Sequence, residues 1–480
     1  MNSIQKEILK KKSLGNTKIV ATLGPETKNK DSIEAIVKEG VSIFRINFSH
    51  GTHESNGDII KNIREVEKNT KIPLTVFADL QGPKIRLGKI KDGKDKLKLG
   101  EEFILTTQEI LGDSTMASIT DIDIKDIEVG KDIYINDGLV KLQITKISGD
   151  KIYTQVVDDG DISDGRGVNF PGTTLSLPAI TQKDKNDLEF SLKAGVDCVA
   201  LSFVRDQQEI QELRNLMGER QVPVIAKIEK WEAVENIESI IQAADVIMVA
   251  RGDLGVELPI EKIPLIQKRI ISLAHTWKKP VITATQMLIS MVDNPTPTRP
   301  EITDIANAIF DGTDAVMLSN ETATGKYPLR SVQTMQRIIQ TTEKSDLFEY
   351  SISVKGEKVE KNYSAAIGAS AVEIAGTIGA CAIFCATELG RTARLVSSRK
   401  PLVPVFALTA KNETMKNLNF FWGVIPLALE KIKDAQEVFE ISADIAKELE
   451  LGEKGSSIVV TSGSKPGITG GTNLIKIQDL

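Results

Sequence analysis

The sequence predicts an α/β protein built on a (β/α)₈ TIM barrel, and two regularities lead to this prediction. Buried parallel strands read as continuous apolar runs, and strands that alternate with helices imply crossover connections. Eight apolar, β-branched runs are candidates for such strands: 17–24, 41–48, 74–80, 198–204, 223–228, 246–250, 280–284 and 315–318. Apolar residues at helical spacing fill most of the intervals, at 31–40, 54–69, 206–217, 231–243, 261–277 and 301–311. Eight such strands can close into a barrel, whose active site lies at the carboxyl ends of the strands.

The interval between residues 80 and 198 is too long for a single crossover connection. It contains short alternating runs punctuated by Gly and Asp, at 97–105, 132–135, 139–147 and 151–157. This spacing predicts a small all-β domain over 87–169, inserted in a βα loop of a barrel formed by 1–86 and 170–345. An insert at the carboxyl end of the strands is placed to act as a lid.

The strand and helix pattern restarts after about residue 345. Helical spacing is found at 363–379 and 391–399, and strand candidates are 381–386, 403–408, 423–429, 457–461 and 473–477. These runs predict a C-terminal α/β domain over 346–480 with its own core. The polar segment 344–361 has little periodicity and is expected to be the linker.

The composition limits the possible partners of this chain. Its 480 residues include 60 Lys and Arg and 66 Asp and Glu, a net charge of −6, which argues against general affinity for nucleic acid or anionic membranes. Cys198, Cys381 and Cys385 lie in or beside apolar runs and are expected to be structural thiols. Neither a signal peptide nor a bilayer-spanning run is found, so we expect a cytoplasmic protein.

Polar clusters follow several of the predicted strands. Residues 45–50 (RINFSH), Lys227 with Glu229, and Arg251 with Asp253 each stand at the end of an apolar run. Side chains two residues apart on a strand point to the same face, so each pair projects together. Two carboxylates among several cations at the ends of barrel strands predict a site for a divalent metal and a phosphate group.

Eight segments of the chain resemble the signatures of the pyruvate kinase family, and they occur in the family's order. They are 17–27 (TKIVATLGPET), 44–51 (FRINFSHG), 79–86 (DLQGPKIR), 167–178 (GVNFPGTTLSLP), 225–229 (IAKIE), 248–259 (MVARGDLGVELP), 283–287 (TATQM) and 317–328 (MLSNETATGKYP). The resemblance implies a catalytic barrel, an inserted small β-barrel lid domain and a C-terminal α/β regulatory domain. It also implies phosphoenolpyruvate and ADP as substrates, pyruvate and ATP as products, and a homotetramer.

The resemblance also implies a role for each matching residue. Lys227, Thr285 and Arg45 would be catalytic, and Gly252, Asp253 and Ser319 would complete the substrate site. Glu229 and Asp253 would hold Mg²⁺ or Mn²⁺. The nucleotide side would be formed by Arg86, His50, Asn47, Arg166 and Asp137.

Lys84 and, before it, Leu80 and Gln81 depart from the potassium-dependent pattern of the family. The potassium pocket is matched by Asn47, Ser49, Asp79 and the carbonyl of Leu80. Potassium-dependent members have glutamate where this chain has Lys84. A lysine ammonium can supply the positive charge that the ion supplies elsewhere, so we expect potassium not to be required.

Two loops of the C-terminal domain resemble a binding site for a phosphorylated effector. They are 387–392 (TELGRT) and 462–473 (SGSKPGITGGTN), and the matching residues are Thr387, Gly390, Arg391, Thr392, Gly467 and Gly470. Gly-rich backbone that opens a helix can form an anion nest. A sugar phosphate or a nucleotide is the expected activator.

Other interpretations stay open at this point. Lys227, Glu229, Arg251 and Asp253 could form a structural ion-pair network, and Thr285 could be a core residue. Another barrel enzyme acting on phosphoenolpyruvate or pyruvate, such as a lyase or aldolase, would share the carboxylates but leaves the lid unexplained. A catalytically silent metabolite sensor is the alternative outside enzymes.

Overall fold

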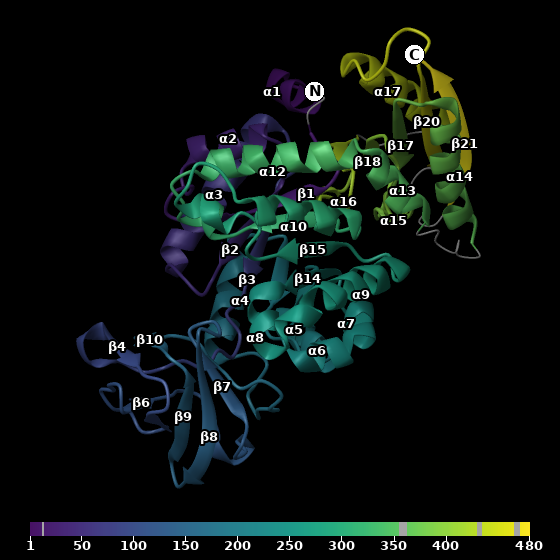
Figure 1. Ribbon diagram of the computed structural model, residues 1–480. Coiled ribbons are helices and arrows are strands. Elements are labelled where there is room, and N and C mark those ends of the chain that lie inside the picture. The colour runs from purple at the N-terminus through teal and green to yellow at the C-terminus, as the bar shows by residue number, and fades with distance from the viewer. Residues whose placement is uncertain (12–13, 355–361, 430–433, 465–470) are drawn as a thin grey trace.

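Eight parallel strands of the computed structural model close into a barrel, which confirms the predicted fold class (Figure 1). The structure describes residues 1–11, 14–354, 362–429, 434–464 and 471–480. In order around the barrel the strands are β1 (Lys18–Leu23), β16 (Ala315–Leu318), β15 (Val281–Ala284), β14 (Val246–Ala250), β13 (Val224–Ile228), β12 (Cys198–Leu201), β3 (Thr75–Asp79) and β2 (Ile43–Asn47). Each of these strands lies within a run that the sequence marked as a strand.

Helices cover the outside of the barrel. They are α2 (Lys30–Lys38), α3 (His53–Thr70), α4 (Gln182–Ala194), α5 (Gln207–Met217), α6 (Trp231–Glu235), α7 (Ile237–Ala243), α8 (Arg251–Glu257), α9 (Ile263–Thr276), α10 (Arg299–Phe310), α11 (Asn320–Ala323) and α12 (Pro328–Glu343). The single helix predicted over 231–243 is divided in two, because Asn236 takes a backbone conformation that ends α6 and begins α7. Thr52 and Thr181 cap α3 and α4 through capping boxes.

The insert after β3 forms a separate lobe with its own hydrophobic core, seen in blue at the lower left of Figure 1. Its strands are β4 (Lys94–Leu97), β5 (Glu102–Thr106), β6 (Met116–Ser118), β7 (Asp132–Ile135), β8 (Val140–Ser148), β9 (Lys151–Asp158), β10 (Gly160–Ser163) and β11 (Val168–Asn169). Six of them form a sheet in the order β11-β7-β8-β9-β5-β6, and β10 pairs with β4. We call this insert the lid domain.

The C-terminal domain contains a five-stranded sheet. Its strands follow the order β19 (Val424–Ala428), β18 (Val405–Thr409), β17 (Ala382–Ala386), β20 (Ser457–Gly463) and β21 (Thr472–Asp479), and β21 is antiparallel to β20. The helices are α14 (Tyr363–Ile378), α15 (Arg391–Ser397), α16 (Asn412–Leu418) and α17 (Ala435–Glu448). The short helix α1 (Ser3–Leu9) lies near α17, where Lys6 forms an ion pair with Glu448 at 2.5 Å.

The predicted linker is wrong over part of its length. Residues 346–354 form α13 (Asp346–Val354), and residues 355–361 lie outside the described residues. Phe348 on α13 is buried and stacks on Trp422 of the C-terminal domain with ring centroids 6.1 Å apart. A tertiary contact therefore supports a helix that its local periodicity did not reveal.

The C-terminal domain meets the barrel at the amino ends of the strands, through buried ion pairs. Lys400 lies 2.6 Å from Asp314, and Lys416 lies 3.1 Å from Asp197. Although burial opposes ionisation of Asp314, Lys400 and His275 lower its pKa to about 2. These pairs fix the two domains together at the end of the barrel opposite the lid domain.

Lys18 lies at the same end of the barrel, and its burial leads us to predict that the free energy of unfolding rises at alkaline pH. Its ammonium is buried and donates to the carbonyl of Val424 at 2.6 Å. Burial lowers the pKa of Lys18 from 10.5 to about 8, while Glu343 opposes this shift. Between these two values the unfolded chain binds more protons than the folded chain, so the free energy of unfolding should rise with pH, by up to about 3 kcal/mol.

This rise can be isolated by comparing the wild type with Lys18→Met. Denaturant unfolding at several pH values from 7.5 to 10 should show the wild type gaining stability relative to the variant as pH increases. Because all other lysines titrate in both proteins, only the difference between the two curves reports on Lys18. Parallel curves would contradict the prediction.

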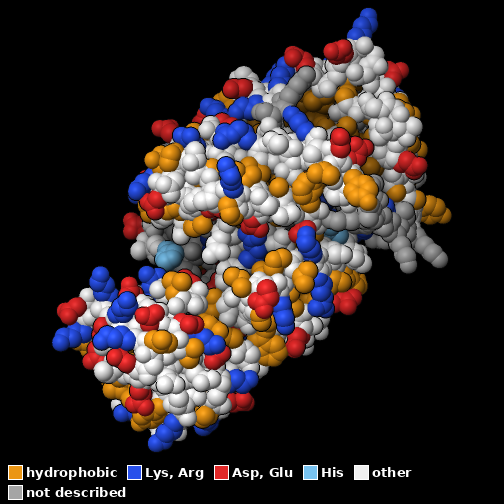
Figure 2. Space-filling view, viewed as in Figure 1, with side chains coloured by type: hydrophobic (Ala, Val, Ile, Leu, Met, Phe, Trp, Pro, Cys, Tyr) orange, Lys and Arg blue, Asp and Glu red, His pale blue; other side chains and the backbone are white. Residues whose placement is uncertain are grey.

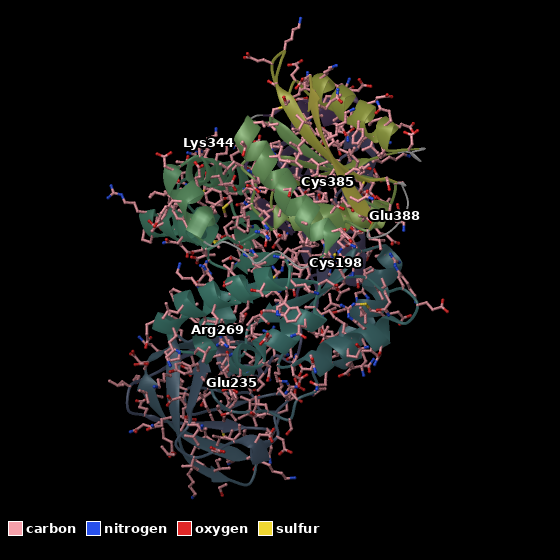
Figure 3. The ribbon with its side chains drawn as sticks, turned by 90° about the vertical axis from the view of Figure 1, so that its right-hand side faces the viewer. Cys198, Glu235, Arg269, Lys344, Cys385 and Glu388 are labelled. Atoms are coloured by element: carbon pink, nitrogen blue, oxygen red, sulfur yellow. The ribbon has the colours of Figure 1, made fainter. Side chains whose placement is uncertain are left out.

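The cysteines occupy separate parts of the fold. Cys198 lies in the barrel and Cys385 in the C-terminal sheet (Figure 3), and both are buried, while Cys381 is half-buried. Burial raises the pKa of Cys385 to about 12 and that of Cys198 well above its usual value. Such thiols are inert at neutral pH, as expected for structural cysteines. Within the described part of the chain, no helix combines the length and hydrophobicity needed to cross a bilayer.

Candidate active site

Lys227 on β13 is the centre of a buried polar cluster at the carboxyl ends of the barrel strands. Its ammonium lies 3.1 Å from Asp79 Oδ1 and 3.0 Å from Glu229 Oε1, and it donates to Ser202 Oγ at 2.7 Å. Although burial opposes the charge, Asp79 and Glu229 raise the pKa of Lys227. The lysine is therefore fully protonated at neutral pH. Ser202, directly after β12, joins that strand to this cluster.

Arg45 on β2 is held against the same cluster from the other side. Its Nε lies 2.6 Å from Asp79 Oδ2, and its Nη1 donates to Thr22 Oγ1 at 3.2 Å. Burial of Asp79 disfavours its charge, but Lys227 and Arg45 lower its pKa. Asp79 thus stays ionised and fixes two cations, one on each of its oxygens.

The two carboxylates predicted to hold a metal lie close enough to influence one another. Burial raises the pKa of Glu229, Lys227 opposes this, and Asp253 raises it further. Glu229 Oε2 also accepts from the backbone amide of Phe203 at 2.8 Å. A divalent cation between two repelling carboxylates would relieve this repulsion, so the residues present fit Mg²⁺ or Mn²⁺.

Two protein carboxylates do not complete an octahedral site. Among the described residues, no group of three or more His, Cys, Asp or Glu side chains could enclose a metal ion. Mg²⁺ usually keeps several waters and binds through one or two carboxylates plus substrate oxygens. Glu229 and Asp253 therefore suit an ion that the substrates help to hold.

Thr285 has a backbone conformation that core β-branched residues do not adopt. Its φ is 70°, in the left-handed region, and the following Gln286 has φ 56°. The Gly252 amide donates to Thr285 Oγ1 at 2.9 Å, and Arg251 Nη2 donates to the Thr285 carbonyl at 2.8 Å. Left-handed β-branched residues are rare and cluster at functional sites. Thr285 is also only half-buried, which excludes the interpretation of an ordinary core residue.

A cationic region surrounds His50 at the mouth of the site. Burial lowers the pKa of His50, and so do the nearby charges of Arg86, Arg45, Lys84 and Lys183. On the face seen in Figure 2, in contrast, basic and acidic side chains are interspersed. A local concentration of cations is therefore present at the site, within a chain whose net charge is negative. Lys183, which also donates to the carbonyl of Phe48, was not identified from the sequence.

Lys84 reaches into the site beneath the lid domain. Its ammonium lies 3.5 Å from Asp253 Oδ1, and both side chains are about one quarter exposed. A Cβ atom on Gly167 would lie 2.9 Å from Lys84 Cε, so the chain returning from the lid domain passes directly over the lysine. Glycine permits this close approach.

The residues matching the potassium pocket are occupied by internal hydrogen bonds. Asn47 Oδ1 accepts from the Ser49 amide at 3.1 Å, and the Leu80 carbonyl accepts from Ser202 Oγ at 2.7 Å. Asp79 is engaged by the two cations described above.

Ser319 follows β16, and its amide donates to Glu321 Oε2 at 2.7 Å, which places it at the same end of the barrel.

The lid residues lie apart from the buried cluster. Arg86 Nη1 donates to the carbonyl of Gly165 at 2.8 Å, and Arg166 is exposed with its Nε donating to Ser163 Oγ at 3.0 Å. Asp137 is exposed on a turn with φ 55°. The structure therefore brings Arg86 to the mouth of the site, whereas the nucleotide roles of Arg166 and Asp137 stay predictions.

The first of the two predicted effector loops lies between β17 and α15. Gly390 begins α15 with φ 80°, next to Arg391, and Thr387 directly follows β17. Thr392 Oγ1 lies 2.6 Å from Thr472 Oγ1, which joins this loop to the start of β21. Gly467 and Gly470 of the second loop lie outside the described residues.

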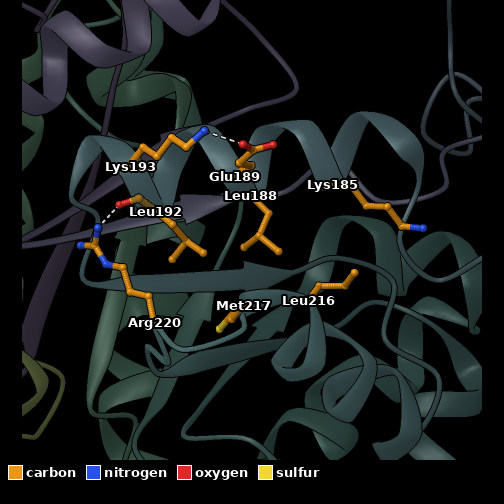
Figure 4. Close-up of a pocket in the computed structure, with 8 residues that line it drawn as sticks. All are labelled: Lys185, Leu188, Glu189, Leu192, Lys193, Leu216, Met217 and Arg220. Carbon is orange, nitrogen blue, oxygen red and sulfur yellow. Dashed lines mark hydrogen bonds and ion pairs between the residues drawn. The ribbon is translucent and has the colours of Figure 1, made fainter.

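A separate groove of about 420 Å³ lies on the outside of the barrel between α4 and the end of α5 (Figure 4). Lys193 pairs with Glu189, and Arg220 donates to the carbonyl of Leu192. None of the residues that line it follows a barrel strand. The groove is therefore not part of the site.

Comparisons with known proteins agree over both the barrel and the C-terminal domain. Residues 14–332 match the family model "Pyruvate kinase, barrel domain", and residues 365–478 match "Pyruvate kinase, alpha/beta domain". The chain is 41% identical over 469 residues to pyruvate kinase 2 of Synechocystis sp., covering 96% of this chain and 79% of that protein. It is 40% identical over 467 residues to the pyruvate kinase of Clostridium acetobutylicum, covering 96% of this chain and 99% of that protein. It is 40% identical over 468 residues to the pyruvate kinase of Geobacillus stearothermophilus, covering 96% of this chain and 80% of that protein.

Proposed function

The chain belongs to the pyruvate kinase family of enzymes, and from this premise we propose that it transfers the phosphoryl group of phosphoenolpyruvate to ADP, giving pyruvate and ATP in glycolysis. One observation supports this most directly. A protonated, buried Lys227 lies between two carboxylates, next to a cationic pocket that opens below the lid domain. The expected compartment is the cytoplasm.

Lys227 and Arg45 would stabilise the phosphoryl group during transfer. A loose transition state spreads charge over three equatorial oxygens, and fixed cations stabilise it without covalent chemistry. Asp79 holds both cations in place through hydrogen bonds of 2.6 and 3.1 Å, so little reorganisation is needed when charge develops. A divalent ion held by Glu229 and Asp253 would neutralise further phosphate charge when bound. Gly252, Asp253 and Ser319 would bind the rest of the substrate.

Thr285 would deliver the proton that converts the enolate to pyruvate, through a water molecule. A threonine hydroxyl alone is too weak an acid at neutral pH, which favours a relay. Thr285 Oγ1 accepts from the Gly252 amide and donates to the Ala284 carbonyl at 2.6 Å. These two bonds fix the hydroxyl beside the segment that carries Asp253.

A coupled assay with purified protein tests this function. Pyruvate formation from phosphoenolpyruvate should depend on both ADP and Mg²⁺ or Mn²⁺. Pyruvate formed without ADP would indicate a lyase or phosphatase instead. Absence of turnover with intact substrate binding would indicate a metabolite sensor.

The metal site predicts a selective effect of Asp253→Ala. Removal of one of two carboxylates should raise the Mg²⁺ concentration for half-maximal rate by about tenfold or more. The KM for ADP should change less, because the proposed role of Asp253 is to bind the metal ion. Glu261→Ala, which removes an exposed acidic residue just beyond α8, is the matched control. An unchanged Mg²⁺ titration would contradict the assignment of Asp253.

We further propose that the enzyme does not require potassium, that it is a homotetramer, and that a sugar phosphate or a nucleotide activates it. The ammonium of Lys84 beside Asp253 supports the first point. Exposed apolar side chains of Ile260, Leu265 and Ile302 on one side of the barrel support self-association. Light scattering with and without sugar phosphates or nucleotides tests the assembly and its response.

A further inference from the structure

The lid domain touches the helix that carries Asp253. Asn169 is the last residue of β11, where the chain leaves the lid domain, and its Nδ2 donates to Glu257 Oε1 at 3.2 Å. Lys230 Nζ lies 2.8 Å from the same oxygen. The Glu257 side chain is only 1% exposed, so both bonds are shielded from water. One carboxylate oxygen thus joins the lid domain, α8 and the segment after β13.

Glu257 is coupled to Asp253 through α8 itself. The two residues lie four positions apart, which is about one helical turn, and they therefore share a face of the helix. A rigid turn transmits a displacement of Glu257 to Asp253 and Gly252. The position of the lid domain and the geometry of the metal carboxylate are consequently linked by a single turn of helix.

A second part of the lid domain approaches the same helix. A Cβ atom on Gly138 would lie 3.7 Å from Val256 Cγ2, which is van der Waals contact. Gly138 belongs to the turn that also carries Asp137. The lid domain therefore contacts the end of α8 through Asn169, and a second lid segment passes close to it at Gly138.

Packing around this contact is incomplete. Among the described residues, buried Glu257 Oε2, Glu232 Oε2 and Trp231 Nε1 lack a hydrogen-bond partner. A cavity of about 30 Å³ lies between the segments that connect the lid domain and the barrel, and Glu232 lines it together with Pro83, Asn169, Phe203 and Lys230, among others. Space and unpaired polar atoms indicate that packing at this junction offers little resistance to a change in the angle of the lid domain.

We propose that Glu257 is a positioning residue, which ties the lid domain to α8 so that lid position and metal-site geometry change together. The inference rests on the proposed function for its kinetic consequence only. Glu257 itself does not touch the cluster around Lys227; it acts through α8.

The test uses four proteins: Asn169→Ala, Glu257→Ala, the double variant that combines these two substitutions, and Glu257→Gln. The alanine variants should each lower kcat by about 10- to 100-fold, because a small misplacement of catalytic groups is costly. The double variant should lose no more than Glu257→Ala alone, since that substitution already removes the contact with Asn169 together with the Lys230 ion pair. Glu257→Gln keeps an acceptor for Asn169, so it should retain most of the wild-type rate that Glu257→Ala loses. Gln155→Ala, an exposed substitution on β9 of the lid domain, should match the wild type.

Two measurements without turnover separate this role from general destabilisation. Mn²⁺ binding followed by electron paramagnetic resonance should weaken several-fold in Asn169→Ala and remain normal in Glu257→Gln. The distance distribution between spin labels at Thr145→Cys and Arg269→Cys, with Cys381→Ser to remove the half-buried thiol, should broaden in Asn169→Ala.

The outcomes are distinguishable. Independent, multiplicative effects of Asn169→Ala and Glu257→Ala, or an unchanged distance distribution and unchanged Mn²⁺ binding, would overturn the proposal. If the wild type forms no pyruvate, the proposed function fails, whereas Mn²⁺ binding and the spin-label distances still decide the role of Glu257.

Discussion

Lys227→Met is expected to lower kcat by on the order of 10³-fold or more, which is the size of effect seen when a fixed cation is removed from a phosphoryl-transfer site. The KM for phosphoenolpyruvate should change far less. The charge of Lys227 acts mainly on charge that develops during transfer, so its loss affects the transition state more than the bound substrate. Initial rates over a full substrate range separate the two constants.

The control for this variant must address the carboxylates that Lys227 neutralises. Its loss leaves Asp79 with Arg45 alone and removes the ion pair of Glu229, so thermal unfolding has to be measured beside the rates. Lys193→Met, which removes an exposed lysine of the outer groove, should keep full activity. A folded Lys227→Met protein with near-normal kcat would refute the assigned role.

Lys84→Glu is expected to create a potassium requirement that the wild type lacks. The wild type should run at nearly full rate in sodium or tetramethylammonium buffer, because its ammonium already lies beside Asp253. In the variant two carboxylates would face each other, and the rate without potassium should fall by about 100-fold, as expected for an uncompensated charge at a catalytic site. Potassium should restore part of the rate, since Asn47, Ser49 and Asp79 are still in place.

Initial rates of both proteins across a potassium titration at constant ionic strength separate specific binding from screening. Restoration should be partial, because Leu80 and Gln81 also differ from the potassium-dependent pattern. Lys89→Glu reverses a charge near the start of the lid domain and should leave the rate independent of potassium. A wild-type rate that climbs many-fold with potassium would show that Lys84 does not replace the ion.

The sequence predicted the barrel well because its strands are buried on both faces. All eight apolar runs became barrel strands, and the polar residues after them converged, as the pairing of Lys227 with Asp79 across two strands shows. Period-two projection explains why Lys227 and Glu229 meet. Such predictions succeed where local pattern and fold geometry agree.

Other features depend on contacts between distant segments. The left-handed backbone of Thr285 is imposed by bonds from Gly252 and Arg251, and the helix α13 depends on Phe348 packing against Trp422. The contact of Asn169 with Glu257 joins segments 88 positions apart. Neither periodicity nor a motif carries such information, because it arises only once the domains are folded together.

Strand β12 connects the two ends of the barrel within very few residues. Asp197, directly before it, is paired with Lys416 of the C-terminal domain, whereas Ser202, directly after it, accepts from Lys227. At about 3.3 Å per residue, roughly 16 Å of extended, fully buried backbone separates the two contacts. Because the strand is close-packed on both faces, it does not bend, and a displacement at one of its ends is transmitted to the other. A shift of Lys416 would therefore be transmitted along β12 to Lys227, without an unfolding step or a long relay of side chains.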